Sequence, residues 1–135
     1  MMRYIFIISL LFFTLTSSSQ QSRFRCYEYS QVPLSDSLEV FKQSEAVVIF
    51  DIGRKKLSII DADFTNEFDL LDIQKYDIVD RILIIMQGVG KDGGKYTISL
   101  LAYTLEEYRN HPRKLAATLL IMNNENKAEY RLTVL

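Results

Sequence analysis

The chain has 135 residues, with 16 Lys and Arg against 17 Asp and Glu, one His and one Cys. This near-neutral balance argues against a nucleic-acid partner and against strong adsorption to a membrane, since both favour a basic surface. A single Cys excludes an internal disulfide, and one His with one Cys excludes the usual zinc ligand sets. We therefore expect no metal or other cofactor, and a domain stabilised by core burial alone.

The first nineteen residues have the pattern of a secretory signal peptide. Arg3 precedes an apolar run over 4–15, and Ser17-Ser18-Ser19 supplies small residues for cleavage before Gln20. The run is about twelve residues long, whereas a membrane-spanning helix needs roughly twenty; an uncleaved N-terminal anchor is the alternative. The pattern predicts a bacterial exported protein (periplasmic, cell-surface or extracellular) whose residues 20–135 form one domain without a stable membrane span.

The first half of this domain alternates with period two. Residues 23–29 are expected to form a strand on which Cys26 is a small buried hydrophobe, the alternative being a disulfide to another chain. Residues 34–44 are compatible with one helical turn. Residues 46–61 read as a hairpin with Gly53 at its turn, and 67–73 as a further strand.

The second half repeats the pattern. Residues 80–87 are strongly apolar and are expected to form a central strand buried on both faces. A glycine-rich turn over 88–94 leads to a strand over 95–104, and Thr104 with Glu107 predicts a capping box for a short helical turn. Residues 115–122 and 128–135 are expected to form a last hairpin.

Together these segments predict an all-β fold. About eight short strands joined by turns are typical of a single antiparallel β-sandwich or a small barrel. The alternative is an α+β fold with a short helix in 34–44 or 104–110.

Two motifs with a chemical association are better explained as structure. Gly88-x-Gly90-x-x-Gly93 matches a dinucleotide fingerprint, but a strand follows it where the pyrophosphate-binding helix is required, so a hairpin tip is expected. Asp61-x-Asp63 is similar to the start of a calcium loop that lacks its glycine and its final Glu, so a solvated strand face is expected.

Catalysis by the single histidine is a weak alternative. His111 lies in a predicted loop, and as a general base it would need a nucleophile and an orienting carboxylate beside it. We therefore expect no catalytic residue.

The tyrosines are the more informative side chains. Removal of the first nineteen residues leaves seven of the eight Tyr, most of them on predicted strands. Tyrosine combines a large contact area with a polar tip, which suits a binding face or the mouth of a barrel. The candidate binding residues are Tyr27, Tyr29, Tyr96, Tyr103 and Tyr130.

The layout resembles small exported β-rich proteins of uncharacterised function of Bacteroidetes type. The residues behind the resemblance are Ser19-Gln20, the 47–50/57–60 hairpin and the 119–122/130–134 pair. The resemblance implies no activity, substrate or site residue.

The sequence predicts a non-catalytic exported module that binds a protein, a glycan or a small apolar ligand. One alternative is a structural or assembly protein that pairs through a strand edge. The other is a small hydrolase that uses His111.

Overall fold

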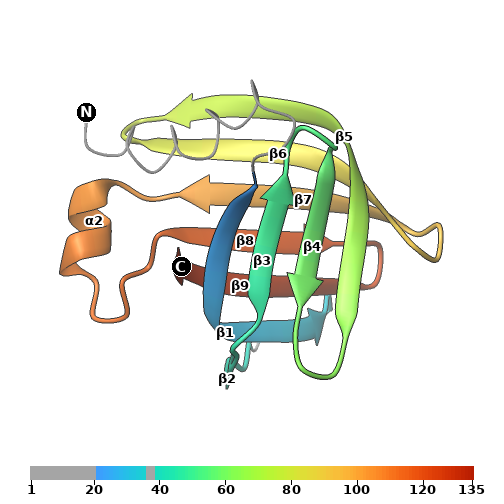
Figure 1. Ribbon diagram of the computed structural model, residues 1–135, viewed down its shortest axis with the longest axis horizontal. Helices are drawn as coiled ribbons and strands as arrows, with labels where there is room; N and C mark the ends of the chain where they lie inside the picture. Colours follow the sequence, from blue (N-terminus) through green and yellow to red (C-terminus); the bar gives the residue numbers. More distant parts are fainter. Residues whose placement is uncertain (1–20, 36–38) are drawn as a thin grey trace.

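A single antiparallel sheet that closes on itself dominates the computed structural model, which describes residues 21–35 and 39–135 (Figure 1). In the described part, its strands and one short helix are β1 (Ser22–Pro33), β2 (Lys42–Gln43), β3 (Val47–Asp51), β4 (Lys56–Ile60), β5 (Thr65–Ile78), β6 (Arg81–Gly90), β7 (Lys95–Ala102), α2 (Leu105–Asn110), β8 (Ala117–Met122) and β9 (Asn126–Val134). Neighbours in sequence pair from β3 through β9, and β1 pairs with both β3 and β9. The fold is therefore all-β, an eight-stranded barrel with β2 added on the outside of the circle.

The barrel closes through the long pairing of β1 with β9. The register runs from Phe24 opposite Val134 to Pro33 opposite Asn126, and it shifts between Cys26 and Glu28 because Tyr27 is an extra residue, a β-bulge. The bulge bends β1, so that its first half also pairs with β3 and its second half with β2. β1 can thus close the barrel between β3 and β9 and also pair with β2 outside it.

Core side chains fill the interior of the barrel. The largest fully buried ones come from seven of the strands and are Phe50, Leu57, Ile59, Leu70, Met86, Ile98, Leu100, Leu119 and Leu132. At roughly 1.5–3 kcal/mol for each buried side chain of this size, these residues explain how the domain folds without a disulfide. Cys26 is a free, buried thiol, as predicted for the first strand.

Several sequence expectations need correction in detail. β6 is buried on one face only, since Ile82, Ile84 and Met86 point inward while Leu83 and Ile85 are half-buried on the outside. Gly53 lies in the β3–β4 turn as predicted, and Lys55 in the same turn has a positive φ of 54°. β1 extends to Pro33, and β2 lies inside 34–44, where a helical turn was one option; residues 36–38 are outside the described part. The helical turn after Thr104 is confirmed as α2.

Gly88 lies inside the barrel where two neighbouring strands approach closely. A Cβ atom there would lie 2.4 Å from Cδ1 of Ile98 and 3.5 Å from Cβ of Phe68. The methyl group of an alanine here would therefore displace the end of the Ile98 side chain, so packing rather than backbone freedom favours glycine at this position.

Replacing Gly88 with Ala should lower the free energy of unfolding by about 1–3 kcal/mol, because the added methyl group overpacks the core. Ile98→Val deletes the Cδ1 atom that the new methyl group would meet. Chemical denaturation of G88A, I98V and the double variant should give a double-variant cost smaller than the sum of the two single costs. Strictly additive costs would contradict this contact as the cause.

Candidate functional site: a polar cleft at the barrel mouth

A cleft of about 460 Å³ opens at the end of the barrel opposite α2, which we call the mouth. The start of β5, the end of β6, the start of β7, the β8–β9 turn and the second half of β1 contribute to it. It is lined by Gln31, Thr65, Asn66, Glu67, Phe68, Gly90, Lys91, Asp92, Tyr96, Ile121, Asn123, Asn126, Lys127, Ala128 and Tyr130.

Aromatic side chains form the apolar part of the cleft. The Phe68 and Tyr96 rings meet edge to face with their centroids 5.2 Å apart. Tyr29 stacks on Tyr130 at 5.9 Å with an interplanar angle of 13°. The bulge at Tyr27 is the reason for this arrangement, because it changes the phase of β1 and brings Tyr29 opposite Tyr130.

The turn between β6 and β7 occupies residues 91–94 and forms one wall of the mouth, whereas Gly88 and Gly90, expected in the turn, belong to β6. Gly90 N–H donates to the Gly94 carbonyl at 2.9 Å, and Gly94 N–H donates to Asp92 Oδ1 at 2.9 Å. A Cβ atom on Gly90 would lie 2.9 Å from Asp92 Oδ1 and 3.3 Å from the Tyr96 ring. The turn therefore packs on Tyr96. The expectation of a hairpin tip is confirmed, because the strand β7 follows the turn where a dinucleotide-binding motif requires a helix.

Four amide side chains give the cleft its neutral polar groups. They are Gln31, Asn66, Asn123 and Asn126. Asn123 Oδ1 accepts hydrogen bonds from the backbone N–H groups of Glu125 (2.9 Å) and Asn126 (2.7 Å), which fixes the β8–β9 turn. Each amide side chain carries both donors and an acceptor, so the cleft can meet a ligand that offers both.

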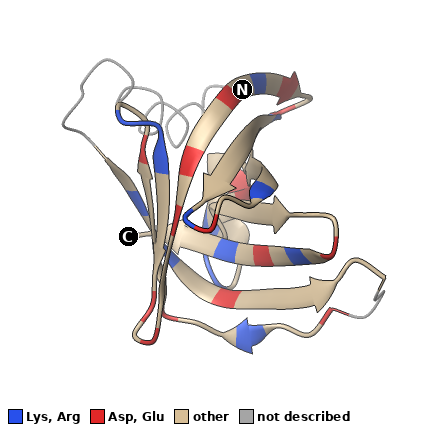
Figure 2. Cartoon of the chain, turned by 90° about the vertical axis from the view of Figure 1, so that its right-hand side faces the viewer, with Lys and Arg blue, Asp and Glu red and all other residues tan. Residues whose placement is uncertain are grey.

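Both lysines that line the mouth have partners of opposite sign. Lys91 Nζ lies 3.6 Å from Glu67 Oε2, and Lys127 Nζ lies 2.7 Å from Glu39 Oε1. In the view of Figure 2, basic and acidic residues are interspersed along the strands. The mouth therefore has mixed and largely balanced charge, which favours a neutral ligand over a strongly ionic one.

A second cleft of about 350 Å³ adjoins the first, because Gln31 and Asn126 line both. Its other lining residues are Tyr29, Val32, Pro33, Val40 and Lys42. The two clefts together extend the polar surface from the mouth along the outside of β1.

Of the five tyrosines predicted to bind a ligand, three lie at these clefts. Tyr96 and Tyr130 line the first and Tyr29 lines the second. Tyr27 is instead buried beneath Arg113, whose guanidinium lies 4.6 Å from the ring centroid. Its burial raises the pKa of Tyr27.

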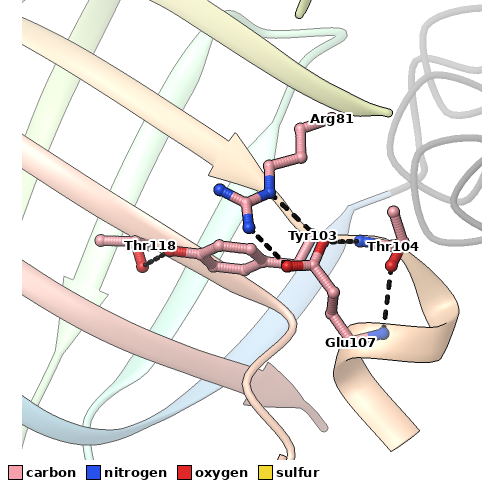
Figure 3. A network of polar contacts seen from close by, with 5 residues as sticks. All are labelled: Arg81, Tyr103, Thr104, Glu107 and Thr118. Carbon is pink, nitrogen blue, oxygen red and sulfur yellow. Dashed lines mark hydrogen bonds and ion pairs between the residues drawn. The ribbon is translucent and has the colours of Figure 1, made fainter. Parts of the chain in front are cut away.

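Tyr103 belongs to a polar network beside α2 (Figure 3). Its hydroxyl lies 3.0 Å from Thr118 Oγ1, and Arg81 lies over its ring with 5.1 Å to the centroid. Arg81 also contacts Glu107 at 2.5 Å, and the hydrogen bonds from Arg81 lower the pKa of Glu107. This network ties the start of β6 to the helix, so Tyr103 has a structural role.

Glu107 also completes the capping box predicted for α2. Glu107 N–H donates to Thr104 Oγ1 at 3.0 Å, and Thr104 N–H donates to Glu107 Oε1 at 3.1 Å. Such a cap contributes about 1 kcal/mol to a helix. It stabilises the short segment that joins β7 to β8 at the end away from the mouth.

The other chemical candidates gain no support from the geometry. His111 Nδ1 accepts a hydrogen bond from the backbone N–H of Arg113 at 3.0 Å, so its basic nitrogen is engaged in a turn. Across the ranges 21–35 and 39–135, no three His, Cys, Asp or Glu side chains gather as a metal site. In the same part of the chain, no helix is long and apolar enough to cross a membrane.

No protein-family model, no curated protein and no solved structure matches this chain.

Tyr130 should ionise at a higher pH than an ordinary tyrosine. Burial, followed by the nearby Cys26 and Tyr29, raises the pKa of Tyr130 to about 12, against about 10 for an unfolded tyrosine. The stability that this shift represents is fully present below about pH 10 and is lost as the pH rises through about 12, on the order of 2 kcal/mol in all. Urea denaturation between these pH values should show a steeper loss for the parent protein than for Tyr130→Phe; equal slopes would refute the assignment.

Proposed function

We propose that this protein is a non-catalytic binding module whose barrel mouth binds a neutral, hydroxyl-rich ligand, a saccharide in chemical class. The observation that carries the proposal is the cleft of about 460 Å³ lined by four amide side chains together with Tyr96 and the buried Tyr130. Sugar hydroxyls both donate and accept hydrogen bonds, which amides can match, and sugar C–H faces pack on aromatic rings.

A small apolar ligand fits the structure less well. Such a ligand would need an apolar chamber, and the barrel interior is occupied by core side chains such as Phe50, Ile59 and Leu119, each fully buried. The polar mouth would leave amide groups unsatisfied against an apolar surface, which costs about 1–3 kcal/mol for each group.

The adjoining clefts favour an oligomer over a single sugar. Gln31 and Asn126 lie between the two and contribute to both. A ligand of several units would contact Tyr96 and Tyr130 in the first cleft and Tyr29 in the second.

Saccharide binding should depend on the exposed amides of the mouth. We expect titration with neutral oligosaccharides (cello-, malto-, xylo- and chito-oligomers), followed by calorimetry, to identify a ligand of micromolar to millimolar affinity. Because each lost hydrogen bond costs about 0.5–1.5 kcal/mol, the double variant Gln31→Ala/Asn66→Ala should bind roughly tenfold more weakly or worse. Failure of every oligomer to bind would refute the proposal.

The matched control is Gln87→Ala/Asn110→Ala, which removes the same two side-chain types. Both residues are exposed and neither lines either of the two clefts described above. These replacements should leave affinity unchanged. An equal loss in the control would contradict the mouth as the binding site.

We further propose that the module works outside the cytoplasm, in the periplasm or at the cell surface. The support is the sequence pattern of residues 1–19, with Arg3, an apolar run and three small residues. Expression of the full chain in a bacterium should yield a protein whose intact mass lacks residues 1–19 and which fractionates with exported proteins. Recovery of the uncut chain in the cytoplasm would contradict export.

A further inference from the structure

The second half of β5 extends beyond its neighbour β4. β4 pairs with β5 from Thr65 to Asp69, and Leu70 N–H donates to the Lys55 carbonyl at 2.8 Å. From Leu71 to Ile78 the pairings recorded for β5 are with β6 alone, and no other strand in residues 21–35 and 39–135 pairs there. Figure 1 shows β5 bending away from β4 and continuing beside β6. One edge of this segment thus has no strand partner among the described residues.

A β-bulge separates the two halves of β5. The register shifts between Leu71 and Gln74, and Asp72 has φ of 51°. Bulges end a pairing and re-aim the side chains that follow. Here Ile73 packs against the core, while Gln74, Tyr76 and Ile78 point outward.

Exposed apolar side chains accompany this edge. The exposed fraction is 52% for Leu71, 44% for Tyr76, 47% for Ile78 and 91% for Val79. On the neighbouring β6, the outward residues Leu83 and Ile85 are half-buried and apolar as well. An edge with unpaired backbone groups and apolar neighbours is a template for strand addition.

Charge on the edge selects the partner and the register. Lys75 and Asp77 lie on one face of β5. Their direct neighbours on β6 are the buried, uncharged residues Ile84 and Ile82. Two copies of β5 placed antiparallel about Tyr76 bring each Lys75 opposite the Asp77 of the other copy, twice per pair. Shifting the centre to Lys75 or Asp77 would place like charges opposite each other, which is destabilising.

The backbone permits this register. A two-residue turn, Val79-Asp80, joins Ile78 to Arg81, and the pair beside such a turn is hydrogen-bonded. Hydrogen-bonded and non-hydrogen-bonded pairs then alternate, so the backbone groups of Tyr76 face β6 and those of Asp77 face the open edge. Lys75 also has an interaction within its own chain. The proposed register therefore depends on the positive charge of Lys75 and not on Lys75 lacking a partner.

We propose that the protein forms a two-fold symmetric dimer in which the 74–78 segments of two β5 strands pair antiparallel, centred on Tyr76. A lysine on a sheet edge often protects it from pairing. Here an aspartate two residues away makes the edge complementary to itself, and the exposed tyrosine at the centre would face its own copy. The dimer buries none of the residues that line the mouth, so it stands or falls independently of saccharide binding.

Charge exchange tests the register in the purified full-length protein. Sedimentation across a concentration series should show a monomer–dimer equilibrium for the parent protein. Lys75→Glu alone and Asp77→Lys alone each place like charges opposite one another and should weaken association at least tenfold. The double variant K75E/D77K restores opposite charges and should regain dimer formation. Circular dichroism melting should confirm that all three variants are folded.

Disulfide trapping tests the centre of the pair. Directly opposed residues in a non-hydrogen-bonded pair have Cα atoms about 4.5 Å apart, within the range for a disulfide. Tyr76→Cys should therefore give a covalent dimer on mild oxidation, whereas the control Gln74→Cys, exposed on the same strand but opposite Ile78 of the other copy, should not. The native Cys26 is buried.

A protein that stays monomeric at every concentration, with no covalent Y76C dimer, would overturn the proposal. A dimer that tolerates both single charge reversals and does not trap Y76C would overturn it too, since it would use another surface.

Discussion

The pairing of β1 with β9 is the interaction on which the rest of the structure depends. It joins the first and last strands of the described sheet, and Arg131 on β9 contacts Glu28 on β1 at 2.6 Å across 103 positions of sequence. Closure removes the sheet edges that an open meander would leave at β1 and β9. The bulge at Tyr27 lets one strand turn this corner, and the same bulge places Tyr29 beside Tyr130 at the mouth. A single extra residue thus shapes both the closure and the cleft.

The two ends of the barrel are consequently unlike. At one end, α2 and its capping box lie beside Arg81, which contacts Glu107 and covers the Tyr103 ring. At the other end, turns alone connect the strands. Amide and tyrosine side chains line the cleft there, together with buried aromatic rings. A filled interior with one polar mouth is a rigid scaffold for surface recognition, since the core positions the loops and the loops carry the contacts.

Local signals in the sequence predicted the local structure. The 46–61 and 115–135 hairpins, the glycine turn and the capping box each depend on residues a few positions apart, and each is present. Barrel closure depends on strands about a hundred residues apart, so the sequence left a barrel and a sandwich equally open. The run over 80–87 was read as buried on both faces because Leu83 and Ile85 are apolar, although they point outward.

The candidate site was predictable only in part, for the same reason. Residue type alone predicts the tyrosines as candidate binding residues, but which of them share an end of the barrel depends on the register and on the bulge. One extra residue reverses the faces of every residue that follows it in a strand, so Tyr27 is buried under Arg113 while Tyr29 reaches the mouth. The four amides of the cleft have no such signal: Asn123 and Asn126 lie between the two segments of the last predicted hairpin, where asparagine is common in turns, and Gln31 and Asn66 have no local pattern that sets them apart.

The unequal lengths of β4 and β5 distinguish the part of β5 that the barrel requires from the part that it does not. β4 has 5 residues and β5 has 14, so the barrel uses only the first part of β5 against β4. The remainder pairs with β6 and exposes Tyr76, Ile78 and Val79. Burial of those side chains would stabilise the fold, yet this chain provides no strand for them among the residues described. This apolar edge adds nothing to barrel closure, and the alternation of Lys75 and Asp77 about Tyr76 gives the proposed pairing with the same strand of a second copy its matching charge.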